Sequence, residues 1–334
     1  MKPITNYKYT QKYITSTKRN WWSRNLMEIL TVFGGLIAIN LIFLADAYTE
    51  SNEIDPTTAG QLGDFVGGYV GTIFALISVV FLYSTLKDQR AASTFEKFET
   101  KYFELIKIHR ENVADIGIGE DFGNKIFVMM IREFREILTI TKDVAKQCQQ
   151  QFSNEQLFII SYYALFFGVG PNSSRMLKEA LTEYDKIFVN KFEETLNNRG
   201  KKNAIKRKRK FKYTPFEGHQ SRLGHYYRHL YQTVSYVNKQ TFNFDKYEDV
   251  KTIRAQLTTH EQALLFINSL TAIGRVWWDD NFIIGYRFVK NIPYGFFDKD
   301  EEIDFESYFP VNYFEYQERR LVNEKKNILN PNNK

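Results

Sequence analysis

The sequence predicts an all-α protein in which an N-terminal two-helix transmembrane hairpin is followed by an α-helical cytoplasmic domain. Two long apolar runs without charged residues lie near the N-terminus, and beyond them apolar side chains recur at helical spacing in segment after segment. No segment alternates apolar and polar residues strongly enough to predict a sheet. We therefore expect a membrane anchor over residues 1–90 and a helical cytoplasmic domain over residues 91–334.

The apolar runs Ile29–Ala45 and Phe65–Tyr83 each approach the roughly 20 residues that cross about 30 Å of hydrocarbon as a helix. They predict transmembrane helices at about 27–47 and 63–85. A buried hairpin in a soluble protein is the alternative interpretation. We disfavour it because neither run sets an apolar stripe against a charged one, as a helix at a protein surface does.

Flanking charges predict the orientation of this anchor. Six Lys or Arg residues precede the first run, whereas the loop between the runs carries acidic residues and no Lys or Arg. The positive-inside rule then places both termini in the cytoplasm and a short acidic loop outside. We expect a multi-pass protein of the cell inner membrane, with the lipid bilayer as its first partner.

Three glycines in the second run, Gly63, Gly67 and Gly71, are spaced four residues apart. Glycines at this spacing let a second helix approach closely and gain van der Waals contacts. The partner helix is either the first span of the same chain, through Gly34, Gly35 and Ala38, or a second copy of the protein. The pattern leaves intramolecular packing and a homo-oligomer both open.

Because no Pro or Gly lies between Gly71 and Gly117, we expect the second span to continue into the cytosol as one long helix. Thr258 or Thr259 is expected to cap a later helix, and Asn291-Ile292-Pro293 to stop the last one. The other helices are predicted at about 122–150, 153–167, 173–198, 246–257, 259–273 and 275–290.

The overall composition is 43% hydrophobic, 16% aromatic and 25% charged, which is typical of a globular chain and not of a disordered one. A single cysteine, Cys148, excludes an intramolecular disulfide framework and suits a reducing compartment. The net charge of +6 arises from one segment, since residues 201–212 carry eight positive charges. The rest of the chain is slightly acidic.

Gly200 and Pro215 flank this basic segment, so we expect an exposed basic loop at 200–213. A solvated run of charge is the simplest interpretation. Binding to anionic lipid headgroups is an alternative, because the anchor holds the loop near a negative surface. Nucleic-acid binding is another. The central charges of the loop are Lys206, Arg207, Lys208, Arg209 and Lys210.

The stretch GHQSRLGHYYRHLYQTVSYV, Gly218–Val237, holds three of the five histidines of the chain. On a helix, Leu223, Tyr227, Leu230 and Val234 form an apolar stripe that must enter the core. A polar cluster lies beside this stripe, where its members are expected to be partly buried or to line a cleft. The cluster comprises His219, Arg222, His225, Tyr226 and His229.

Three interpretations of the cluster stay open. His225 and His229 are spaced to chelate one metal ion, but no Asp, Glu or Cys of the same helix completes the ligand shell. Arg222 and His229 fit the permissive Rx4–6H pattern of the all-helical HEPN ribonucleases, in which a histidine moves a proton and an arginine stabilises phosphate charge. Arg254 and His260 fit it too. We favour the third, a structural polar seam with no metal, in which the polar residues face the helices that carry Phe95–His109 and Arg254–Glu261.

Several familiar signatures are absent from the sequence. The chain has no GxxxxGK[ST] loop, no GxGxxG after a strand, no CxxC pair and no HExxH. No cofactor is therefore predicted, and a nucleotide-driven enzyme of a familiar kind is disfavoured.

Five segments of the chain form a recognisable set, in the order GDFVGGYVGTIFALISVVFLYSTLKDQR (63–90), FEKFETKYFELIKIHRENV (95–113), GHQSRLGHYYRHLYQTVSYV (218–237), YEDVKTIRAQLTTHEQALLFINSL (247–270) and FVKNIPYGFF (288–297). As a set, they resemble the AbiC-like family of putative phage abortive infection proteins in bacteria. The resemblance implies N-terminal membrane spans, a helical cytoplasmic part and a role in antiviral defence, in which an infected cell stops growing or dies. It supplies no established catalytic residues, so none are transferred to this chain.

Three mechanisms are compatible with that role. In the first, the protein is a sensor or effector at the inner membrane that acts by membrane disruption. In the second, it is a tethered HEPN-like ribonuclease that uses Arg222 and His229. In the third, it is an adaptor that binds another defence protein or a phage protein as the trigger. We favour a non-enzymatic mechanism.

Overall fold

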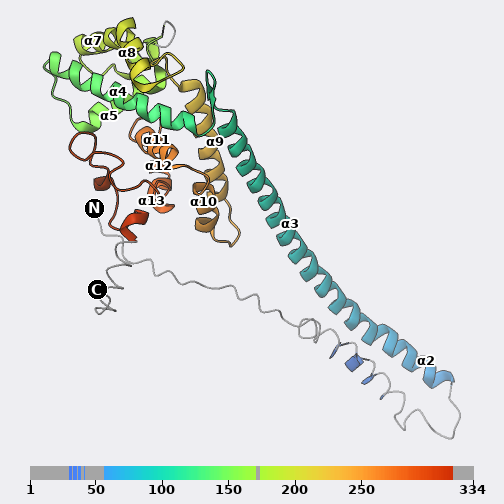
Figure 1. Ribbon diagram of the computed structural model, residues 1–334. Helices are drawn as coiled ribbons and strands as arrows, with labels where there is room; N and C mark the ends of the chain where they lie inside the picture. The colour runs from blue at the N-terminus through green and yellow to red at the C-terminus, as the bar shows by residue number, and fades with distance from the viewer. Residues whose placement is uncertain are drawn as a thin grey trace, which may run out of the picture. The chain divides into compact units, whose positions relative to one another are not determined.

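The computed structural model describes residues 30–31, 33–35, 37–38, 41, 56–170 and 174–318. The chain divides into two compact units, Met1–Phe95 and Glu96–Lys334, which we describe separately. Helices form nearly all the regular structure of the described residues, so the predicted all-α class is confirmed (Figure 1). The strands found there are two short ones, β1 (Gly117–Ile118) and β2 (Asp121–Phe122), which pair antiparallel.

The first unit contains α2 (Pro56–Phe65), a π-helical turn (Val66–Val70) and the beginning of α3 (Gly71–Asp115). Helix α3 is continuous, as expected from the lack of Pro and Gly within it. Within the described part of the chain, one helical stretch, Ala59–Asp115, is long and apolar enough to cross a membrane by length and composition. The first predicted span, 27–47, lies largely outside the described residues.

The second predicted span presents apolar side chains outward within its unit. Leu76 and Val79 are 65% and 61% exposed. The hydroxyl groups of Thr72 and Ser78 donate to backbone carbonyls four residues earlier in the helix. The polar groups are thus satisfied within the helix while the surface stays apolar, which is what hydrocarbon requires of a segment that crosses it.

The second unit holds the rest of α3 and all later elements. The helices that follow the β1–β2 hairpin are α4 (Lys125–Gln147), α5 (Asn154–Phe167), α6 (Ser174–Ala180), α7 (Lys186–Asn197), α8 (Arg199–Arg209), α9 (Gln220–Asn238), α10 (Lys246–Arg254), α11 (Thr259–Ser269), α12 (Val276–Asp279), α13 (Phe282–Gly285) and a 3-10 turn, η3 (Phe305–Tyr308).

Helix α4 is at the centre of this unit and packs against α5, α7 and α11 (Figure 1). Its sequence places apolar residues at helical spacing, so one broad face is buried. The same face carries two buried carboxylates, Glu133 and Glu136. Its fully enclosed apolar residues are Ile126, Phe127, Met130, Ile131, Phe134, Ile137 and Val144.

The predicted cap near residue 258 is confirmed at Thr258, the residue before α11. Its hydroxyl accepts a hydrogen bond from the Glu261 N–H, and the Glu261 carboxylate accepts one from the Thr258 N–H at 2.7 Å. This reciprocal pair satisfies two backbone donors that the first turn of a helix leaves without partners.

Two predicted helices are each divided in the structure. The segment predicted at 173–198 forms α6 and α7, because the Asp185 side chain accepts from the Phe188 N–H and starts a new helix. The segment predicted at 275–290 forms only the short α12 and α13. Asn281 and Arg287 adopt left-handed backbone angles, with φ of 59° and 50°, which an α-helix does not allow.

The prediction of a basic loop at 200–213 is wrong over most of its length, because residues 199–209 form helix α8. The Asn198 side chain caps the helix by accepting from the Lys201 N–H at 3.0 Å. Lys208 and Arg209 pair with buried Glu136 at 2.8 and 2.6 Å, which offsets the repulsion among like charges. The helix ends at Lys210, whose φ is 56°.

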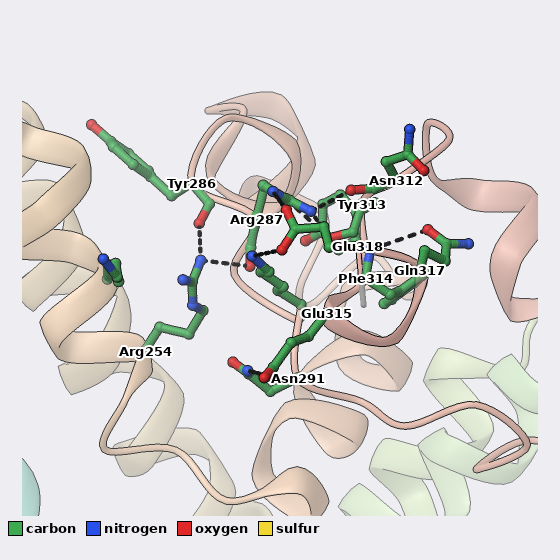
Figure 2. Close-up of polar contacts among 12 residues, drawn as sticks. Arg254, Tyr286, Arg287, Asn291, Asn312, Tyr313, Phe314, Glu315, Gln317 and Glu318 are labelled. Carbon is green, nitrogen blue, oxygen red and sulfur yellow. Dashed lines mark hydrogen bonds and ion pairs between the residues drawn. The ribbon is translucent and has the colours of Figure 1, made fainter. Parts of the chain in front are cut away.

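Two arginines hold the segment that follows α13 in place through hydrogen bonds to backbone carbonyls (Figure 2). Arg254 is buried and donates from Nη1 to the carbonyls of Tyr286 and Arg287 at 2.8 and 3.1 Å. Arg287 in turn donates from Nε to the Tyr313 carbonyl at 2.9 Å. Arg254 therefore uses its guanidinium group to bind backbone carbonyls. In the Arg254–His260 match to the Rx4–6H pattern, the arginine thus has a structural role.

Two glycines cross where the end of α5 meets the segment before α9. Gly168 and Gly218 have φ values of 78° and 87°, which L side chains rarely adopt. A Cβ at Gly168 would overlap the backbone of Glu217, and one at Gly218 would overlap the Phe167 carbonyl. This contact sets the point at which α9 begins.

We expect Gly168→Ala and Gly218→Ala each to lower the free energy of unfolding by about 2–4 kcal/mol, because each adds left-handed strain and a backbone overlap. The measurement is urea unfolding of the full chain in detergent, followed by circular dichroism. Gly224→Ala within α9 is the matched control: its new Cβ would lie 3.9 Å from the nearest side-chain atom, so stability should stay the same or rise. Parent-like stability of Gly218→Ala would contradict the proposed role of the Gly168–Gly218 crossing.

Candidate functional site

A buried carboxylate on α4 fixes the segment that leads into α9. Glu133 is fully buried and accepts hydrogen bonds from the Tyr213 hydroxyl at 2.5 Å and the Phe216 N–H at 2.6 Å. The Nε2 atom of His219 lies 3.0 Å from the same carboxylate. The backbone N–H of His219 also donates to the carbonyls that end α5. His219 is therefore a positioning residue at the start of α9.

Burial alone would raise the pKa of Glu133. The charge of His219 and the hydrogen bonds from His219, Tyr213 and the Phe216 N–H outweigh burial and hold the pKa below its ordinary value. The carboxylate is consequently ionised at neutral pH, so His219 Nε2 donates to it. Burial and this carboxylate together raise the pKa of the Tyr213 hydroxyl, which stays protonated as a donor.

Two more members of the predicted cluster are also engaged in structural contacts. Arg222 is half-buried and donates from Nε to the Gly117 carbonyl at 2.7 Å, which ties α9 to the β1–β2 hairpin. Tyr226 is buried and donates to Glu261 at 2.8 Å, where it meets the cap of α11. The predicted polar seam thus connects α9 to three other elements.

His229 packs against His109 of α3, within the segment that was expected to face it. The rings of His109 and His229 stack with centroids 6.0 Å apart and planes 16° apart. Within the described part of the chain, none of their four ring nitrogens has a hydrogen-bond partner. Burial and then repulsion from His229 lower the pKa of His109 to about 4, and burial and then His225 lower the pKa of His229. Both rings are neutral at neutral pH.

A cleft of about 770 Å³ opens along the exposed edge of α9. This volume is within the range of small-molecule sites, about 300–1,000 Å³. Helix α9 contributes the polar groups Gln220, Ser221, His225 and Arg228, together with Gly224 and two tyrosines. Helix α5, the end of α11 and the segment around α12 contribute a mainly apolar set, namely Phe166, Phe167, Asn268, Ile273, Val276 and Trp277.

A second, smaller cleft of about 280 Å³ lies on the other side of His225. It shares Ser221 and His225 with the first cleft, and its lining includes Asp115 and Arg222. Exposed His225 therefore stands between two clefts, whereas His219 and His229 are directed into the core. Of the three histidines of α9, His225 is the one that a ligand can reach.

The remaining predicted positions are placed elsewhere. Gly63, Gly67 and Gly71 belong to the first unit, and a Cβ at any of them would meet no described atom closer than 3.8 Å. In α8, Lys208 and Arg209 pair with Glu136, while Lys206, Arg207 and Lys210 form no ion pair with the described residues. No three His, Cys, Asp or Glu side chains come together as metal ligands in the described segments.

Sequence reasoning missed Glu133 and the α5 side of the cleft. A signal for Glu133 was present, because it lies on the apolar stripe of α4 between Met130 and Ile137, where a charge needs a buried partner. The helix that carries Phe95–His109 was expected to face His229, and the structure identifies His109 as the residue in contact.

We expect acid to destabilise the protein through His109. Its folded pKa of about 4 lies below the ordinary 6.5, so the unfolded chain binds more protons between these values. The stability that His109 contributes is full above about pH 6.5 and is lost toward pH 4, a change of about 3 kcal/mol. His109→Phe should flatten this slope and leave stability at about pH 7.5 unchanged or higher, because it removes unpaired buried nitrogens.

The measurement is urea unfolding of parent and variant at several values between about pH 7.5 and pH 4.5. His260→Phe is the matched control, since His260 is only half-buried against Phe296 and should flatten the slope less. A His109→Phe variant that keeps the slope of the parent would refute the assignment.

The segment that forms α9 and its cleft is similar to a known protein family. Residues 218–297 match the model of a family described as putative phage abortive infection protein. Searches of curated proteins and of solved structures returned no match to the chain. The matched segment runs from the Gly218 crossing through α13, and it contains every residue lining the larger cleft except Phe166 and Phe167. The resemblance of this chain to the AbiC-like family of putative phage abortive infection proteins is thereby confirmed for residues 218–297, the segment that builds α9 and its cleft.

Proposed function

We propose that this protein is a membrane-anchored phage-defence protein that acts at the inner membrane. In this proposal, the helical domain detects infection through the cleft along α9, and the membrane helices then disrupt the bilayer. One observation carries the proposal: the segment that matches the abortive infection family supplies α9 and nearly the whole lining of that cleft. A cleft of this size and mixed polarity suits recognition of a ligand.

Membrane attachment is supported by the first unit. The apolar side chains of the second span face outward, its hydroxyls are satisfied within the helix, and the glycine face of Gly63, Gly67 and Gly71 is open among the described residues. An open glycine face allows a second helix to approach closely. Assembly or rearrangement of such helices is a direct way to breach a bilayer.

The geometry does not favour a ribonuclease built on Arg222 and His229. The ring nitrogens of His229 are buried against His109, out of reach of a substrate hydroxyl, and the Arg222 Nε is bonded to the Gly117 carbonyl. General acid–base catalysis requires the imidazole to be within hydrogen-bond reach of the proton that it moves. Among the described residues, no surface as well defined as the cleft supports the adaptor mechanism.

We expect Gly67→Leu/Gly71→Leu to abolish protection against phage, while protein abundance and membrane content stay near those of the parent. The added side chains meet no close described atom of the chain itself, so they would act by blocking a partner helix. The readout is plating efficiency, with membrane potential and bulk RNA integrity followed after infection. Potential should collapse first.

The control is Val80→Leu. It enlarges an exposed side chain on the face of α3 opposite Gly71 and should leave protection intact. Full protection by the double glycine variant would end the packing proposal. Loss of RNA integrity before loss of potential would favour a nuclease instead.

Reporter fusions test the proposed orientation. A reporter after Glu53 should behave as extracytoplasmic and one after Lys334 as cytoplasmic, because the charge before the first span is positive and the intervening loop is acidic. The reverse pattern would refute the orientation, and a fully soluble product would refute the anchor.

A further inference from the structure

We propose that the larger cleft along α9 binds a nucleotide, with the base against its apolar side chains and the phosphate at Arg228 and His225. This inference rests on the function proposed above and names the chemical class of the ligand that its cleft would take. Three observations lead to it: an unexplained glycine, an arginine without a partner among the described residues, and an uncovered apolar surface.

The glycine is Gly224, within helix α9. Glycine inside a helix is less stable than alanine by about 1 kcal/mol, so its presence there calls for a structural reason. Packing does not supply one, since a Cβ at Gly224 would lie 3.9 Å from Phe166, at ordinary contact distance. Its backbone is helical and needs no left-handed angle. What the missing side chain provides is space in the cleft, between Ser221 and Arg228.

Arg228 is the one Lys, Arg, Asp or Glu among the described residues that line the cleft. Arg228 is exposed, and neither it nor His225, one turn earlier, forms a hydrogen bond or ion pair with the described residues. No Asp or Glu lines this cleft, and the nearby Asp280 and Asp279 are engaged by Tyr231 and Arg275. Asp115 belongs to the second cleft, beyond His225. An arginine without a partner in a cleft without acids is suited to an anion.

The apolar surface of the cleft is exposed although it is large. Ile273 and Val276 are 41% and 38% exposed, and half-buried Phe167 lies with them along the cleft. Aromatic side chains at Phe167 and Tyr231 offer a flat ring either a face or an edge. The combination of an apolar, aromatic side with a cationic side complements a ligand that has a planar ring at one end and a phosphate at the other.

A buried amide stiffens this part of the cleft. Asn268 is 1% exposed and reaches the cleft lining, and its Nδ2 donates to the Tyr162 hydroxyl at 2.9 Å. Its side-chain oxygen lies against Gly274, where an added Cβ would come within 2.2 Å of it, so the amide serves to hold the wall of the cleft in place. Because the chain lacks the glycine-rich phosphate loops of common nucleotide enzymes, side chains and not backbone amides would hold the phosphate.

The test is titration calorimetry of the full-length protein in lipid nanodiscs. The probes are the ribonucleoside monophosphates, with the matching nucleosides and inorganic phosphate as half-ligands. At least one monophosphate should bind at least about tenfold more tightly than its nucleoside or phosphate alone, because both sides of the cleft are then engaged. If every monophosphate binds more weakly than about 1 mM, or no better than phosphate, the proposal is overturned.

Variants locate the site. Arg228→Gln should weaken monophosphate binding at least about tenfold and leave nucleoside binding unchanged, since it removes only the charged contact. Gly224→Leu should abolish binding of both by filling the cleft. Arg175→Gln is the matched control, an exposed arginine of α6 that pairs with Glu179, and should bind like the parent. Parent-like binding by folded Gly224→Leu or by Arg228→Gln overturns the assignment.

Should Gly224→Leu fail to fold, Ser221→Phe provides a second block from an exposed position on the same edge of α9. The binding assay contains no phage, so its result is separate from the defence assay. Protection without nucleotide binding would overturn this inference and keep the defence function. Nucleotide binding without any protection would keep the site and overturn the defence function.

Discussion

The position of α9 depends on one buried carboxylate. Glu133 lies on the core face of α4, the helix that packs against α5, α7 and α11. It binds Tyr213, the Phe216 N–H and His219 at the same time. A buried ionised carboxylate is unfavourable unless several donors satisfy it, so the three partners have little freedom to move. The Gly168–Gly218 crossing allows the backbone to come close enough for this contact. The point at which α9 begins then sets the direction in which each of its side chains is presented.

This placement divides the polar residues of α9 into two groups with different roles. Those on the inner side bind other elements: His219 binds α4, Arg222 the β1–β2 hairpin and Tyr226 the start of α11. Those on the outer edge, His225 and Arg228, have no partner among the described residues. The inner contacts hold α9 rigidly while the edge that carries His225 and Arg228 stays open, which is the arrangement that a binding site needs.

The sequence was sufficient for features that depend on local pattern. Helical periodicity predicted α4, α5, α9 and the long α3, and a capping pattern predicted Thr258. Features that depend on distant partners could not be read from it. His219 and Glu133 are 86 residues apart, and Lys208 and Glu136 are 72 apart, so neither the positioning role of His219 nor the helical state of the basic segment was evident. The segment that holds three of the histidines was correctly predicted to form a helix. Which of them faces the cleft was not evident, because His229 is turned toward His109 of α3.

The site requires residues from outside the segment that matches the family. Residues 218–297 include α9 and most of the cleft, but the matched segment cannot position α9 without Glu133 of α4, nor complete the cleft without Phe166 and Phe167 of α5. The His229 ring stacks on His109 of α3, a helix whose N-terminal part belongs to the apolar stretch. A ligand in the cleft would contact α9 directly, and α9 contacts α3 through this pair of rings. The helix that packs against α9 is therefore also the one that carries the apolar stretch, so both parts of the proposed function would depend on one continuous element.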